Sequence, residues 1–401
     1  MLRTLSRDLG YNNRLLMLSL FVWALGEGLW INLRQLYLAQ LGANPVQIGT
    51  ALAIEAFSRV VILIPAGYLA DRLGPYKLVI ASSIMGIIGP VLMLLAPTWQ
   101  WAVPGMTFYS MSAFALPSIS ALALLSIPDK TTPLINEKTV AAIFAAYAAG
   151  LIISPAIGGE IAEYWGIHTC LWIGAAFYVL SLIVLFFPHH VELQEHERHE
   201  EHPRELLGNR RFLTLVLYYG SAALVFMTGW HLAPNFYNQV RQFPLQLIGW
   251  LFSAFSLGTV VFNLVAGRVS RNWNYALMLG IIWLAMLGAL QSTTLPPALI
   301  SFAGLGAIWS ARAMATSGIS TVVKPQNHAL AFSALDTMTA LASSGAAQIA
   351  GQLFAIQPGL PFVASLIGLP VMIVLWLGMR SVQHGKAATT KTILIPPVHG
   401  D

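Results

Sequence analysis

Charged side chains lie inside apolar stretches of this chain, and they are the residues whose types could carry chemistry. Glu27 and Arg34 interrupt the first apolar stretch, and Glu55 and Arg59 interrupt the second. A charge at the centre of a membrane helix costs at least about 2.5–3.5 kcal/mol, so each group needs a partner or water. A carboxyl group removed from water favours its neutral form and can exchange a proton near neutral pH. Glu27 is therefore the candidate proton carrier, and Arg59 is expected to modulate its proton affinity.

The spacing of these residues indicates how helices would present them. Glu27, Trp30, Arg34 and Tyr37 follow one another at i, i+3, i+7 and i+10, which places them on one face of a helix. Glu55 precedes its basic partner by four residues, one turn apart in the favourable acid-first order.

Depth along the two helices predicts which charges meet. With a rise of about 1.5 Å per residue, Glu27 and Arg59 each lie about 20 Å from the turn that joins their helices. Arg34 lies about 9 Å and Glu55 about 13 Å from that turn. We therefore expect Glu27 to be level with Arg59, and Arg34 to be nearly level with Glu55. One interpretation is a proton-coupling group, and the other is a structural ion-pair network that locks the two helices together.

The composition indicates what must surround these residues. The 401-residue chain is 57% hydrophobic and only 9% charged, with a mean hydropathy of +0.69. Soluble domains carry about 25% charged residues, so lipid rather than water is the expected solvent. The net charge of +5 does not indicate nucleic-acid binding, because the basic residues lie in short loops between apolar stretches.

Twelve apolar stretches are each long enough to cross a bilayer as a helix. They are 14–40, 46–70, 78–96, 101–127, 139–163, 168–188, 212–238, 246–267, 275–294, 297–322, 330–356 and 361–380. This predicts an all-α membrane protein with a six-helix bundle at 1–188, a polar linker at 189–211, a second six-helix bundle at 212–380 and a disordered tail at 381–401. A few positions repeat at an offset of 200, including Ile48-Gly49 and Ile248-Gly249.

Lys and Arg concentrate in alternate loops, on the side that holds both termini. The positive-inside rule therefore predicts cytoplasmic N- and C-termini in a multi-pass protein of the cell (inner or plasma) membrane.

A short turn between the second and third stretches carries a recognisable motif. Residues 67–77 read G-Y-L-A-D-R-L-G-P-Y-K, and Gly74-Pro75 is expected to break any helix. The segment resembles the loop signature of the major facilitator superfamily of transporters, G-x-L-x-D-R-x-G-x-x-K, at the matching place in the topology. The resemblance implies a gating role for the motif residues, which are Gly67, Asp71, Arg72, Gly74 and Lys77.

The fifth stretch carries a second motif, G-L-I-I-S-P-A-I-G-G at 150–159. It looks like the antiporter motif of the drug:proton branch, with Ser154 where that motif usually has glycine. We expect Pro155 to kink the helix, and Gly150, Gly158 and Gly159 to allow close packing that seals one side of the protein. The alternative is a generic packing face of small residues.

The second half contains its own intramembrane charges, Arg312 and Asp336. Their depths allow a direct ion pair. Alternatively Asp336 meets Arg72, as contacts within the superfamily imply. Either contact indicates a latch of the inner gate, or a purely structural pair.

Aromatic and polar residues could form a substrate-binding wall. Those expected to line it are Trp30, Tyr37, Trp230, His231, Asn235 and Tyr237. An interfacial aromatic belt is the alternative for residues so close to the ends of their spans, and a lone histidine more often only satisfies hydrogen bonds.

The linker contains five histidines, which are His189, His190, His196, His199 and His202. A solvated linker accounts for them better than a metal site, because no fixed ligand geometry is implied. We find no Walker-type phosphate loop, nucleophile elbow or metal-binding helix, so we expect no metal, no cofactor and no enzyme activity.

These observations predict a member of the major facilitator superfamily, similar to its drug:proton antiporter branch. It would export small amphipathic or hydrophobic compounds by rocking of its halves, driven by protons and working as a monomer in the lipid bilayer. The alternative is proton-coupled uptake of a small polar or anionic solute, with Arg34 or Arg59 binding the anion. A membrane receptor or scaffold that transports nothing is the remote alternative.

Overall fold

The structure is a computed structural model that describes residues 10–127, 133–187, 203–266, 274–324 and 327–392. These residues form helices joined by short turns, and none of them forms a strand. Helices satisfy their own backbone hydrogen bonds, as a segment in hydrocarbon must. The predicted all-α class is confirmed.

The first half contains seven α-helices and two 3-10 turns that follow the first six predicted spans. In chain order its elements are α2 (Gly10–Trp30), η1 (Ile31–Leu33), α3 (Arg34–Gln40), α4 (Pro45–Leu94), α5 (Trp99–Met111), η2 (Ser112–Ala115), α6 (Leu116–Leu125), α7 (Pro133–Trp165) and α8 (Ile167–Val184). The helix α4 begins at Pro45. Its N-cap residue, Asn44, and Gln47 in its first turn form a reciprocal capping box.

The second half follows the remaining predicted spans. Its elements are α9 (Pro203–Gly208), α10 (Arg210–Trp230), α11 (Ala233–Asn235), the π-helical turn η3 (Phe236–Val240), α12 (Leu245–Ala266), α13 (Asn274–Gln291), α14 (Leu295–Leu305), α15 (Ala307–Ser320), α16 (His328–Ile356) and α17 (Leu360–Thr392). The helix α9 lies in the predicted linker, and α17 continues past Arg380. The prediction of a disordered tail from Ser381 is therefore wrong for 381–392, and 393–401 lie outside the described residues.

Eleven helical segments of the described chain are long and apolar enough to cross a membrane. The remaining predicted span corresponds to α16, which is 29 residues long. Polar residues along it, including Asp336, Ser343 and Gln348, make it less apolar than the others. Twelve crossings therefore remain a prediction, although helices occupy every predicted span, with α4 covering two spans and four other spans divided between shorter elements.

The turn predicted at 67–77 is much tighter than expected. Residues 45–94 form one helical segment in which Gly74 alone has non-helical backbone angles, with φ of 72° and ψ of 162°. A positive φ is a conformation that glycine adopts without steric cost. The predicted break at Gly74 is therefore confirmed, and the seven-residue turn is replaced by a sharp kink.

The first, fourth, seventh and tenth predicted spans are interrupted where the sequence indicates continuous helices. The interruptions fall at 31–33, 112–115, 231–232 and 306. Broken membrane helices expose backbone groups that only a protein interior or a wet passage can satisfy. The breaks lie in corresponding spans of the two halves, which supports the internal repeat.

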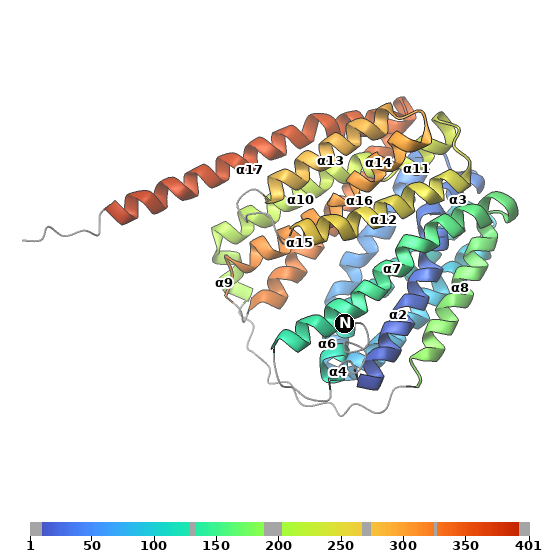
Figure 1. Cartoon of the computed structure of the whole chain (residues 1–401), viewed down its shortest axis with the longest axis horizontal. Coiled ribbons are helices and arrows are strands. Elements are labelled where there is room, and N and C mark those ends of the chain that lie inside the picture. Colours follow the sequence, from blue (N-terminus) through green and yellow to red (C-terminus); the bar gives the residue numbers. More distant parts are fainter. Residues whose placement is uncertain (1–9, 128–132, 188–202, 267–273, 325–326, 393–401) are drawn as a thin grey trace, which may run out of the picture.

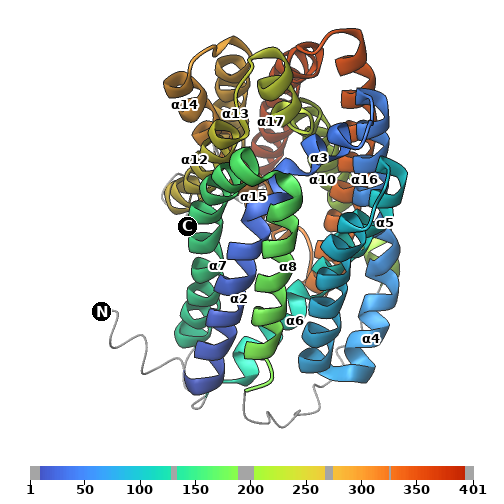
Figure 2. The same ribbon diagram turned by 90° about the vertical axis from the view of Figure 1, so that its right-hand side faces the viewer.

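The two halves meet near one end of the helices. We call this end the far face, formed by the turns at 41–44, 95–98 and 241–244, and we call the end that holds Gly10 the terminal face. The helix α4 packs on α16, and α7 packs on α12. Figure 1 shows the two groups of helices converging near α3 and α11 and diverging toward α9 and α6. Figure 2 shows α2, α7 and α8 side by side in the first half.

The hydrogen bonds between the halves also lie near the far face. Among the described residues, those that join the halves all lie within about 18 Å of the far face, counted along the helices. Their partners are Gln35 and His231, Thr50 and Gln348, Ala53 and Ser344, Ala156 and Ser253, Glu160 and Gln246, and Glu163 and Leu245. The far face is thus closed in this structure.

Candidate functional site

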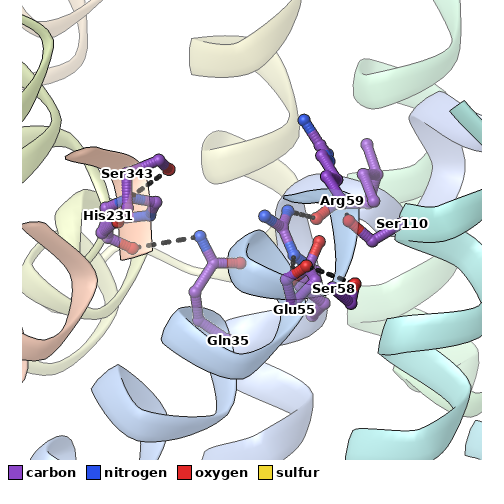
Figure 3. Close-up of polar contacts among 9 residues, drawn as sticks. Gln35, Glu55, Ser58, Arg59, Ser110, His231 and Ser343 are labelled. Atoms are coloured by element: carbon purple, nitrogen blue, oxygen red, sulfur yellow. Dashed lines mark hydrogen bonds and ion pairs between the residues drawn. The ribbon is translucent and has the colours of Figure 1, made fainter. Parts of the chain in front are cut away.

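An ion pair between Arg34 and Glu55 joins the first two spans. The Arg34 Nε atom lies 2.9 Å from a carboxylate oxygen of Glu55, and the two side chains are 18% and 5% exposed. Arg34 also donates to the carbonyl of Ile31, which the turn η1 leaves free of regular helical bonding. The juxtaposition predicted from depth is confirmed, and Figure 3 shows Glu55 at the edge of this polar cluster.

Glu27 has a hydroxyl group rather than a cation as its closest partner. The Tyr147 hydroxyl on α7 donates to a Glu27 carboxylate oxygen at 2.6 Å. Tyr109 also interacts with this carboxylate, and Arg59 acts on it only through its field. The prediction that Glu27 and Arg59 are level holds, but among the described residues they form no ion pair.

Aromatic side chains surround Glu27. Trp23 stacks on Tyr178 with ring centroids 4.1 Å apart, and Trp30 meets Tyr109 edge to face at 4.7 Å. The Trp30 indole nitrogen donates to the Tyr178 hydroxyl at 3.1 Å. Such a cluster keeps bulk water away from the carboxyl group while offering it hydroxyl groups. Sequence reasoning missed it because Tyr109, Tyr147 and Tyr178 come from three separate spans.

Arg59 lies one turn beyond Glu55 on α4. Its side chain is exposed, and its Nε atom donates to the Ser110 hydroxyl at 2.8 Å (Figure 3). It lies within electrostatic range of Arg34 in its own half and of Arg312 in the other half. Because the exposed side chain of Arg59 lies within electrostatic range of Arg312 in the opposite half, it faces the passage rather than the lipid.

The second half contains the matching ion pair. An Arg312 Nη atom lies 2.7 Å from an Asp336 carboxylate oxygen, with the side chains 39% and 44% exposed. The guanidinium group also lies over the Trp309 ring, with its Cζ atom 5.3 Å from the ring centroid, as in a cation–π interaction. The direct pair is one of the two predicted contacts. The side chain of Arg72, the other predicted partner, lies outside the described residues.

The six central charges thus fall into two ion pairs and two separate groups. Glu55 and Asp336 are each bound by an arginine, whereas Glu27 is bound by a tyrosine hydroxyl and Arg59 by a serine hydroxyl. A carboxylate in an ion pair keeps its charge, whereas a hydroxyl partner can serve both forms of a carboxyl group. Glu27 is therefore the acid of this set best able to exchange a proton.

Most of the predicted substrate wall is used for helix packing. Trp30, Tyr37 and Tyr237 are at most 5% exposed. The hydroxyl groups of Tyr37 and Tyr237 donate to backbone carbonyls at 2.9 Å and 2.8 Å, respectively. These three side chains do not reach the passage in this structure, because helix ends nearby offer free carbonyl groups.

The remaining members of the predicted wall lie at the break in the seventh span. Trp230 packs on Phe255 with ring centroids 4.4 Å apart. His231 lies with its ring nitrogen 3.1 Å from Ser343, and its carbonyl accepts from Gln35 of the other half (Figure 3). Asn235 is 1% exposed, and its amide atoms have no hydrogen-bond partner. Their role in substrate binding stays a prediction.

The antiporter-like motif on α7 packs against both halves. A Cβ added at Gly158 would lie 2.3 Å from the Leu29 carbonyl oxygen of the first half, and one added at Gly159 would lie 2.7 Å from the Leu245 carbonyl oxygen of the second. The Ser154 hydroxyl donates to backbone carbonyls at positions 24 and 150, so serine fits where the motif usually has glycine. The expected close packing is observed, and it lies at the closed far face.

The first motif is described only in part. The side chains of Asp71 and Arg72, and the surroundings of Gly67, lie outside the described residues. Gly74 forms the kink in α4, and Lys77 is exposed just beyond it. The gating role of this motif stays a prediction.

The described residues contain no group of three or more His, Cys, Asp or Glu side chains that could hold a metal ion. The five histidines of the linker, at 189, 190, 196, 199 and 202, lie outside the described residues. Whether the linker binds a metal is not tested.

Comparisons with known proteins agree with this architecture. A family model described as Major Facilitator Superfamily matches residues 15–247. The chain is 27% identical over 199 residues to Multidrug resistance protein 1 of Bacillus subtilis, covering 49% of this chain and 48% of that protein. It is 26% identical over 146 residues to an uncharacterized transporter of Buchnera aphidicola, covering 36% of each. The chain thus spans about a third to a half of the length of these curated relatives.

Solved structures match over almost the full chain. The structure is similar to a nucleoside transporter, NupG, with a TM-score of 0.78 at 14% identity, covering 92% of this chain and 99% of that one. It is also similar to a POT family transporter in complex with 5-aminolevulinic acid, with a TM-score of 0.71 at 14% identity, covering 93% and 97%. At this identity the similarity shows the fold alone.

Proposed function

Because the chain belongs to the Major Facilitator Superfamily of transporters, we propose that it is a proton-coupled antiporter that exports small amphipathic or hydrophobic compounds. The two halves rock about the central charges, so that the passage opens alternately at the terminal face and at the far face. The terminal face is cytoplasmic in this proposal, and the protein works as a monomer without a cofactor.

The observation that carries this proposal is the hydroxyl partner of Glu27. The other two central acids are bound by arginines, whereas the Tyr147 hydroxyl lies 2.6 Å from the Glu27 carboxylate. A tyrosine hydroxyl donates to an ionised carboxylate and accepts from a protonated one, so Glu27 keeps a partner in both states. A carboxyl group with this property can carry a proton through a transport cycle.

The neighbourhood of Glu27 supports an amphipathic substrate. Trp23 is partly exposed beside the Glu27 site, next to the buried Trp30, Tyr109 and Tyr178, and an aromatic ring beside a carboxyl group suits apolar compounds that carry one polar or cationic group. The similarity to a multidrug resistance protein favours the same class.

The experiment replaces Glu27 by glutamine and measures pH-gradient-driven efflux of an amphipathic dye, ethidium, from membrane vesicles. We expect Glu27→Gln to reach the membrane in wild-type amount and to lose proton-driven efflux. Glu205→Gln is the matched control, because Glu205 binds Lys324 near the terminal face, away from the passage. Undiminished proton-driven flux in Glu27→Gln would reject Glu27 as the coupling residue.

Arg59 supports a second candidate, the proton-coupled uptake of a small anionic solute. Its side chain is exposed, and its Nε atom donates to the neutral hydroxyl group of Ser110. An arginine open to the passage can bind a carboxylate or phosphate. Protonation of Glu27 would leave Arg59 in positive excess, so an anion and a proton would bind together.

Proton exchange at fixed pH separates the two candidates. In antiport, ethidium binding releases a proton from the purified protein, because the two compete for Glu27. In uptake, binding of a small carboxylate such as benzoate draws a proton in. The sign of the measured proton change therefore decides between export with proton competition and uptake with proton co-binding.

A further inference from the structure

Two glutamates at the far-face end of α7 cross from the first half to the second. A Glu163 carboxylate oxygen accepts a hydrogen bond from the Leu245 backbone nitrogen at 2.7 Å. A Glu160 carboxylate oxygen accepts from the Gln246 side-chain nitrogen at 2.6 Å. Both acids thus bind the first two residues of α12, and the contact exists only while the far face is closed.

The first turn of α12 is a favourable partner for negative charge. The backbone N–H groups at the start of a helix have no partner within the helix, and the helix dipole adds positive potential there. Pro244, just before α12, has no N–H group to contribute. Glu163 thus satisfies the N–H of Leu245 from the opposite half of the protein.

The surroundings leave these carboxylates without a basic partner. Neither Glu160 nor Glu163 forms an ion pair with a cation of the described chain. Of the helices that pack on α7, α6 and α12 have no ionisable side chain, and those of α2 (Tyr11, Arg14 and Glu27) lie deeper, Glu27 about 20 Å from the far face. On α8, the His168 ring lies 3.4 Å from the carbonyl that ends α4, and the Cys170 thiol donates to a carbonyl of α7. Arg241, before α12, donates to a carbonyl of α13.

We propose that Glu160 and Glu163 form a second proton-binding site, at the far face, which latches the two halves together. When both groups are ionised, their hydrogen bonds to α12 are charge-assisted, and such bonds are about twice as strong as neutral ones. Protonation removes the charge and turns one carboxyl oxygen into a donor that the backbone N–H of α12 cannot use. Acid on the far side therefore weakens the latch and opens the far face.

This site acts on the conformation and is independent of the proton exchange proposed for Glu27. Its two groups lie at the end of α7 on exposed or half-buried positions, so protons reach them from the far side while the halves are closed. The site therefore senses the pH of the far compartment.

The test measures the width of the far face in the purified full-length protein. Spin labels are attached at Trp165→Cys and Thr293→Cys, two exposed far-face positions on opposite halves. Between about pH 8 and about pH 4, a range that spans the protonation of an ordinary glutamate carboxylate, we expect the open population of the wild type to rise by up to about tenfold. In Glu160→Gln/Glu163→Gln we expect that raised open population at every pH.

Two further variants keep the test decisive. Gln246→Val removes the partner of Glu160 alone, so we expect a smaller rise in the open population and a retained response to pH through Glu163. Glu205→Gln, at the ion pair with Lys324 near the terminal face, leaves the far face intact, so we expect a wild-type response. A pH response that survives in the double glutamine variant, or that disappears in Glu205→Gln, would overturn the proposal and assign the response elsewhere.

Discussion

The seam between α4 and α16 and the seam between α7 and α12 can be compared residue by residue, because the chain repeats itself. A Cβ added at Gly49 would lie 2.6 Å from an α16 carbonyl oxygen and 2.8 Å from the Cα of Gly351. One added at Gly249 would lie 2.3 Å from an α7 carbonyl oxygen and 2.8 Å from the Cα of Gly159. Gly49 and Gly249 correspond at the offset of 200, and each meets a glycine of the opposite half, so both seams bring helix backbones into contact in the same way.

The polar groups at the two seams differ. In the α4–α16 seam, α4 is capped by its own residues, since Asn44 and Gln47 exchange hydrogen bonds of 2.9 Å. In the α7–α12 seam, the first N–H of α12, that of Leu245, is bound by Glu163 of the other half. The cap of α4 therefore survives when the halves separate, whereas the contact of Glu163 with α12 is lost.

The repeated glycines and the two glutamates of α7 therefore have separate roles. The repeated glycines set how closely the halves can approach, and they do so equally on both sides. The glutamates belong to one seam only, so the cost of opening that seam changes with pH while the cost of opening the other does not. One seam therefore acts as a neutral contact and the other as a latch that responds to acid.

The largest effect is expected from filling the glycine contacts. Gly49→Val and Gly249→Val each place side-chain atoms against the backbone of the opposite half, and overpacking of this kind costs about 1–3 kcal/mol. We expect both variants to shift the far face to its open form by a similar factor, and to lose transport. The spin-label distance across the far face measures the shift.

Gly280→Val is the matched control, because a Cβ at Gly280 meets no atom within 4 Å. If Gly49→Val and Gly249→Val differed by more than about tenfold in open population, a 1.4 kcal/mol difference, the two seams would not share one backbone geometry. A closed far face in both variants would show that the halves can shift to accommodate the added side chain.

A smaller effect is expected from the cap of α4. Asn44→Ala removes the side-chain acceptor for the Gln47 N–H, and the loss of such a cap costs about 1 kcal/mol. Because this cap lies within one half, we expect a lower melting temperature with no change in the pH response of the far face. An altered pH response in Asn44→Ala would mean that the α4–α16 seam also senses acid.

The sequence predicts the fold well because composition and length constrain it strongly. Apolar stretches of sufficient length correspond to every helix that crosses between the faces, and Gly74 is found at the expected break. The interruptions at 31–33 and 231–232 were not predicted, because local hydrophobicity is the same in a broken helix as in a continuous one. The polarity of α16 was visible in the sequence, but a pattern of small polar residues does not exclude a membrane helix.

The candidate site was predicted where local geometry was enough. Helical rise alone brings Arg34 level with Glu55, and their ion pair is observed at 2.9 Å. The partner of Glu27 could not be found in this way, because Tyr147 comes from a span more than a hundred residues away. Glu163 was overlooked for a related reason: at the end of a span an acid looks like a solvated residue until the neighbouring helix is known.

The smallest effect is expected from moving part of the latch to the other seam. Glu160 follows the seam glycine Gly159 as Gln352 follows Gly351, and Gln246 corresponds to Val46 at the offset of 200, so the α4–α16 seam lacks both partners of that contact. Gln352→Glu alone places a carboxylate on an exposed position without a donor, and we expect a change below about 0.5 kcal/mol and no response to acid.

The double variant Val46→Gln/Gln352→Glu restores the donor, so we expect it to close the far face more firmly at neutral pH, by about 0.5–1 kcal/mol. This gain should disappear as the pH falls, because protonation of the new carboxyl group removes the charge assistance. The spin-label distance across the far face measures both changes. An acid response in Gln352→Glu alone would mean that negative charge at a seam is sufficient, and that the hydrogen bond to the opposite half is not what makes the α7–α12 seam a latch.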